Sequence, residues 1–172
     1  MERRCYWQSM RLAGSDPRQL SDPPRSSAGN TLPLEDQYQK EFYRCLYTIL
    51  DGQVVISPEF VIKKRTGGGT IDFFVAPKWG FELLRDRDRL VGHMERFKEG
   101  GQCFDMIQSG DMEQYIVLDF TVSQPKQCHP EYQGHLYHVV FTENYREVQV
   151  IDASDLKTVN SFTLSENPNP MA

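Results

Sequence analysis

The chain has few cysteines and no long apolar run, and these absences exclude several classes of protein. Its four cysteines form no CxxC pair, and the one Cys/His-dense stretch, residues 128–138, has no standard zinc spacing. No apolar run approaches the roughly 18 residues of a membrane-spanning helix. The first residues also lack the apolar segment of a secretory signal. We therefore expect an intracellular protein of the cytoplasm or nucleus, with no membrane partner.

Charge of either sign is unevenly distributed along the chain. The net charge is −5, but residues 60–98 carry 9 basic and 5 acidic side chains, whereas residues 99–172 carry 3 and 11. The overall balance argues against strong nonspecific binding to nucleic acid. The middle segment can still present a local basic surface to phosphates.

Three regions follow from the composition. Residues 1–33 are predicted to be a disordered lead-in, because residues 11–33 are rich in Ser, Pro and Gly without periodicity. The folded domain is predicted over residues 34–166, and a flexible tail over residues 167–172. This arrangement gives one folded unit plus tails.

Apolar periodicity predicts the order α-β-β-β-α-β-β-β within that domain. The first helix is expected from Leu34 to a stop at Asp51-Gly52, and a strand interrupted at Pro58 follows. A second helix is expected from an N-cap at Asp86, with its apolar stripe in the core. That stripe consists of Leu90, Met94 and Phe97. Three strands are then predicted at residues 114–123, 136–142 and 147–152.

A β-hairpin is predicted where two alternating runs flank residues 76–78. Val75 then faces Trp79, which brings Asp72 opposite Glu82 on one face. The other face is apolar throughout and consists of Ile71, Phe73, Val75, Trp79, Phe81 and Leu83. We expect this apolar face in the core and the acidic pair on the side that points away from it.

Facing carboxylates repel each other unless something compensates them. A hard divalent cation such as Mg²⁺ does so, and it can also bind a phosphate and activate water for phosphodiester hydrolysis. Glu41 on the first helix could reach this site from one side, and Lys64 could supply positive charge from another. In the alternative interpretation, Lys64, Arg85 or Arg96 forms salt bridges with the acidic pair, which then only orients a sheet edge.

A glutamate on the first helix, Ile71-Asp72 at the start of the second strand, Glu82 on the third strand and a following helix together resemble the PD-(D/E)XK, or restriction-endonuclease-like, phosphodiesterases. The runs LEDQYQKEFYRCLYTIL, GGGTIDFFV, WGFELLRDRDRL, GHMERF and YIVLDF carry a narrower resemblance. Over residues 34–168 the chain most closely resembles the C-terminal nuclease-like domain of fungal Crinkler-type effector proteins. The resemblance implies an α/β (α+β) fold with an α-β-β-β-α-β core, a mixed central sheet and additional C-terminal strands. It also implies a Mg²⁺- or Mn²⁺-dependent DNA nuclease. Its metal ligands would be Asp72 and Glu82, with Glu41 as the acidic residue of the first helix.

One position departs from the family pattern. The superfamily has a lysine two residues after the acid of the third strand, where this chain has Leu84. Either Lys64 or Arg85 fills the catalytic role of that lysine, or the domain is catalytically inactive and binds nucleic acid or a protein partner. A small interaction module that pairs through a strand edge is a further alternative. A homodimer is the default expectation for a nuclease that cuts both strands.

Overall fold

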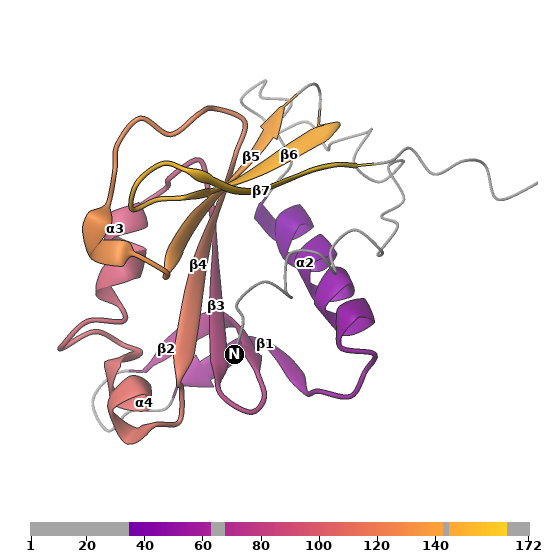
Figure 1. Ribbon diagram of the computed structural model, residues 1–172. Helices are drawn as coiled ribbons and strands as arrows, with labels where there is room; N and C mark the ends of the chain where they lie inside the picture. Colours follow the sequence, from indigo (N-terminus) through magenta and orange to yellow (C-terminus); the bar gives the residue numbers. More distant parts are fainter. Residues whose placement is uncertain (1–34, 63–67, 143–144, 165–172) are drawn as a thin grey trace, which may run out of the picture.

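The computed structural model describes residues 35–62, 68–142 and 145–164. Within these residues the chain forms one seven-stranded sheet, whose strands lie side by side in chain order from β1 to β7 (Figure 1). The elements are α2 (Glu35–Ile49), β1 (Ile56–Ile62), β2 (Gly69–Val75), β3 (Trp79–Arg85), α3 (Leu90–Glu95), α4 (Phe104–Ser109), β4 (Gln114–Thr121), the 3₁₀ turn η2 (Pro130–Tyr132), β5 (Leu136–Thr142), β6 (Glu147–Asp152) and β7 (Thr158–Thr163).

The sheet is mixed. Strand β4 runs parallel to both β3 and β5, and every other neighbouring pair is antiparallel. The chain crosses from β3 to β4 through α3 and α4, and from β4 to β5 through a loop that contains η2. The predicted α/β class and mixed sheet are therefore confirmed. The restriction-endonuclease-like topology stays a prediction.

Helix α2 covers one face of the sheet (Figure 1). Its residues Tyr38, Phe42 and Leu46 recur every four positions and pack against apolar side chains of β2, β3 and β4. The helix ends at Ile49, just before Asp51 and Gly52, which both have positive φ. The predicted helix end is confirmed, whereas the predicted start at Leu34 lies outside the described residues.

The opposite face is covered by α3, α4 and η2. Leu90, Met94 and Phe97 are buried there with Leu84, which confirms the stripe of the second helix. The predicted N-cap is wrong, because α3 begins only at Leu90 and Asp86 belongs to the turn before it. Sequence patterns also missed α4, a short helix with no buried residue, and β7, an edge strand that is mostly exposed.

The hairpin register was predicted correctly. Val75 pairs with Trp79 and Phe73 pairs with Phe81, so Asp72 and Glu82 lie at the same level. The predicted faces are partly wrong, because helices cover both sides of the sheet and Glu82 is as buried as its apolar neighbours. The predicted face of Ile71 is also wrong, because its side chain packs in the core beneath α3 and not in the core beneath α2.

Candidate functional site

Glu82 lies in the interior between β3 and α3, where its carboxylate has two basic partners. Its side chain is 1% exposed. Its Oε1 accepts a hydrogen bond from Nη1 of Arg96 and lies 2.9 Å from Nδ1 of His93. Arg96 also donates to the backbone carbonyl of Thr70 on β2. The salt bridge between Glu82 and Arg96 therefore joins the hairpin to the helical layer, and the ion pair with Arg96 that the alternative interpretation included is present.

Asp72 holds the hairpin strands together where their backbone pairing stops. The strand pairs end at Phe73 and Phe81. One step further along, Oδ2 of Asp72 accepts a hydrogen bond of 2.7 Å from the backbone nitrogen of Leu83. This carboxylate thus takes the place of a strand carbonyl. It lies level with Glu82 but binds a different group.

Of the other predicted site residues, the structure describes Glu41 and Arg85, and it brings neither to this carboxylate pair. Glu41 lies on α2, which packs on the opposite face of the sheet, and binds Arg44 at 2.8 Å. Arg85 is the last residue of β3, and its Nε lies 3.9 Å from Oδ2 of Asp86. The expectation that Glu41 reaches the acidic pair is therefore wrong, because the sheet separates them. Lys64 lies outside the described residues.

Leu84, at the position of the family's lysine, is a core residue. Its side chain is 3% exposed and belongs to the cluster that contains Met94 and Leu90 of α3. An ammonium group there would lose its hydration within an apolar cluster. The helical layer thus explains why this position carries leucine.

The side chains around Asp72 and Glu82 do not fit the Mg²⁺ ion that the family resemblance implies. Mg²⁺ needs a nearly octahedral set of oxygen ligands and usually keeps several waters. Here Glu82 is closed to solvent and already neutralised by Arg96. Among the described residues no group of three or more His, Cys, Asp or Glu side chains could hold a metal ion. We therefore assign no hydrolytic step to this pair.

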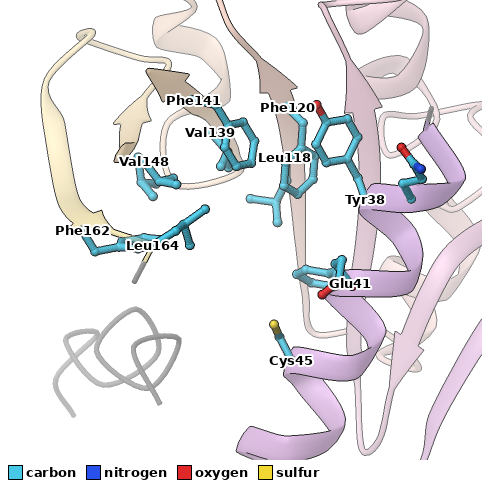
Figure 2. A pocket seen from close by; sticks show the side chains of 13 residues that line it. Tyr38, Glu41, Cys45, Leu118, Phe120, Val139, Phe141, Val148, Phe162 and Leu164 are labelled. Carbon is cyan, nitrogen blue, oxygen red and sulfur yellow. The ribbon is translucent and has the colours of Figure 1, made fainter. Parts of the chain in front are cut away.

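An apolar cavity of about 120 Å³ is lined by residues of α2 and of strands β4 to β7. Figure 2 shows Tyr38, Glu41 and Cys45 on the helix, facing Phe162 and Leu164 across this cavity. Burial raises the pKa of the Cys45 thiol, and it also raises the pKa of the Tyr38 hydroxyl. Both groups are therefore kept neutral, and neither is an activated nucleophile.

A second polar cluster was missed by the sequence analysis. Asp119 of β4 and His138 of β5 are direct partners in the parallel register, and both are buried. The Oδ2 atom of Asp119 lies 2.7 Å from Nδ1 of His138. The available signal was a charged or titratable residue within each of two apolar strand runs, YIVLDF and LYHVVF. Periodicity alone could not show that these two residues face each other.

Comparisons of the chain with protein-family models, with curated proteins and with solved structures found no match. In the described part of the chain, no helix is both long enough and apolar enough to cross a membrane. The function is therefore inferred from the residues and their geometry.

Proposed function

We propose that this chain is a restriction-endonuclease-like domain that binds nucleic acid without hydrolysing it. The observation that carries the proposal is the ion pair between Glu82 and Arg96. In the family that the sequence resembles, the acid at the position of Glu82 would bind the metal ion. Here the guanidinium of Arg96 lies against it in the interior, so the positive charge comes from the protein itself.

Two further features support an inactive member of that fold. The elements α2, β1, β2, β3, α3 and β4 follow the α-β-β-β-α-β order expected of the core. Leu84 replaces the lysine that would stabilise the attacking water. Arg85 lies on the side of α2, where burial raises the pKa of Tyr38 and the charge of Arg85 opposes that shift. Neither residue can therefore supply the positive charge that the family's lysine brings to the attacking water.

A basic cavity supports nucleic-acid binding. It has a volume of about 820 Å³ and lies where β3 and β4 end. Arg87, Arg89 and Lys126 line it, and none of its described lining residues is acidic. Phosphate groups are the part of a nucleic acid that such side chains bind, without regard to base sequence.

A Mg²⁺- or Mn²⁺-dependent DNA nuclease is the second candidate, and one observation favours it. Oε2 of Glu82 is buried and has no hydrogen-bond partner among the described residues, and Asp72 lies at the same level of the hairpin. In this candidate Asp72 and Glu82 are the metal ligands, and Arg96 must leave Glu82 before a metal can bind.

Plasmid nicking separates the two candidates. Supercoiled DNA is incubated with the purified chain and Mg²⁺ or Mn²⁺, and with Asp72→Asn and Glu82→Gln prepared identically. We expect no nicking by the wild type, together with retention of a fluorescent DNA duplex at low salt. Metal-dependent nicking that both variants lose would establish the nuclease instead.

The binding arm of the same experiment tests the remaining part of the proposal. Lys126→Ala should weaken retention of the duplex, whereas Lys157→Ala, which removes an exposed lysine outside the cavity, should leave it unchanged. A folded wild-type chain that retains neither duplex nor single-stranded DNA at low salt would favour the interaction module. Sedimentation of the free and DNA-bound chain tests the expected homodimer.

A further inference from the structure

In the pair formed by Asp119 and His138, one imidazole nitrogen has no hydrogen-bond partner among the described residues. Oδ2 of Asp119 faces Nδ1 of His138, and its Oδ1 accepts a hydrogen bond of 2.7 Å from the backbone nitrogen of Arg87. Both carboxylate oxygens are therefore occupied. Nε2 of His138 is buried and has no hydrogen-bond partner among the described residues.

This unpartnered nitrogen belongs to a residue that lines the basic cavity. His138 forms part of the wall together with Arg87, Arg89, Lys126 and His129. In sheets with parallel strands, ligands bind beyond the carboxyl ends of the strands, which is where this cavity lies. Its volume of about 820 Å³ falls within the range of small-molecule sites.

The turn that forms one side of the cavity is held in an unusual conformation. Asp86, Arg87 and Arg89 all have positive φ, a region that residues other than glycine rarely adopt. The guanidinium of Arg87 donates to the hydroxyl oxygens of Thr121, at 3.1 Å, and Ser123. Contacts with β4 and its loop thus fix the turn, and the cavity is preorganised before any ligand arrives.

The surrounding charges decide what kind of ligand would satisfy Nε2. A buried polar atom without a partner is unfavourable, so a bound group should supply the missing hydrogen bond. A cation is disfavoured because three basic side chains line the cavity and none of its described lining residues is acidic. The ligand must therefore bring anionic oxygens.

We propose that this cavity binds a phosphomonoester, in which a phosphate oxygen forms the hydrogen bond that Nε2 of His138 lacks and Arg87, Arg89 and Lys126 neutralise the phosphate charge. The phosphate can belong to a free mononucleotide or to the 5′ end of a nucleic-acid strand. Only the second source rests on the proposed nucleic-acid binding. The cavity then recognises a strand end, whereas an unbroken phosphodiester backbone lacks the terminal group with its additional charge.

The test compares ligands that differ only in the phosphate. Isothermal titration measures the affinity of AMP against adenosine, and of a 5′-phosphorylated oligonucleotide against its 5′-hydroxyl counterpart. We expect the phosphorylated member of at least one pair to bind about tenfold to a hundredfold more tightly, as for a hydrogen bond to a charged group. Lys126→Ala and His138→Phe should reduce this preference, and Lys157→Ala should preserve it.

The possible outcomes separate this inference from the proposed function. A preference for AMP without any oligonucleotide binding supports the phosphate site and contradicts the proposed function. Equal affinity of the two oligonucleotides and equal affinity of AMP and adenosine overturn the inference, even where the chain binds DNA. If His138→Phe fails to fold, the wild type is titrated with AMP and the ¹⁵N chemical shift of Nε2 is followed. The inference requires this chemical shift to change, and an unchanged shift overturns it.

Discussion

At the scale of single residues, the partner of a charge determines what that charge can do. Asp72 and Glu82 lie at one level of the hairpin, yet one carboxylate binds a backbone nitrogen and the other binds Arg96 and His93. Carboxylates with partners inside the protein are poor ligands for a hydrated cation. The same residue types that suggest a metal site in the sequence therefore form a structural connection in the fold.

The ion pair between Glu82 and Arg96 should be costly to break. Arg96→Met leaves the Glu82 carboxylate buried without its cation, and we expect a loss of about 3–5 kcal/mol in the free energy of unfolding. The double variant with Glu82→Leu should recover most of this loss. Urea denaturation measures both. Arg44→Ala, which removes the partner of Glu41 in a solvent-exposed pair, should cost at most about 1 kcal/mol.

Cys45 should react slowly with alkylating reagents. Burial raises the pKa of its thiol, and only the thiolate is nucleophilic, so little of the reactive form exists at mildly alkaline pH. Cys128 is exposed and serves as the internal comparison. Mass spectrometry after brief iodoacetamide treatment should find Cys128 modified before Cys45. The reverse order would contradict the packing of α2.

At the scale of elements, the segment after α3 positions the residues that contact Glu82. The backbone nitrogen of Cys103 donates to the carbonyl of Arg96 at 2.8 Å, so the chain folds back over the end of α3. Gly101 lies inside this return. A Cβ atom there would be only 2.3 Å from the carbonyl oxygen of Glu95 and 2.4 Å from that of Arg96. The position of Arg96 thus depends on a glycine some residues away.

Gly101→Ala should therefore destabilise the domain through the end of α3. Overpacking costs about 1–3 kcal/mol or more, and we expect the upper part of that range because the obstructing atoms are backbone. Gly110→Ala is the matched control. Its φ is +75° but nothing lies within 4 Å of a Cβ atom, so the substitution should cost only the strain of a left-handed alanine, about 1–2 kcal/mol. Equal losses in the two thermal unfolding midpoints would contradict this account.

At the scale of the whole molecule, the distribution of charge limits how the chain meets a polyanion. The net charge is −5, so a phosphate backbone should be repelled from most of the surface. Arg87, Arg89 and Lys126 come from turns after two neighbouring strands and gather at one end of the sheet. Binding of nucleic acid should consequently depend on this one cavity.

The salt dependence of DNA binding measures how many phosphates are neutralised. If the three basic residues of the cavity each neutralise one phosphate of a duplex, the logarithm of affinity should fall with the logarithm of salt with a slope of about −2.7. Lys126→Ala should make the slope shallower by about 0.9. A steeper wild-type slope that Lys126→Ala leaves unchanged would place the contacts elsewhere on the molecule.

The sequence by itself determined the local structure, because the signals for it are local. Helix α2, the buried stripe of α3 and the register of Val75 with Trp79 follow from the spacing of apolar residues and from one short turn. The mixed sheet agrees with the predicted class. Short α4 and edge strand β7 were missed because they bury little apolar surface.

Only the tertiary structure decided which polar side chains meet. The sheet separates Glu41 from Glu82, the packing of α3 brings Arg96 to Glu82, and parallel pairing places Asp119 beside His138. The sequence offered Arg96 only as one of three candidate partners of the acidic pair, and no local pattern indicated which of the three meets Glu82 or that Asp119 meets His138. Since the chemistry of a carboxylate or an imidazole depends on its burial and its partners, the function of these groups could be argued only once the fold had placed them.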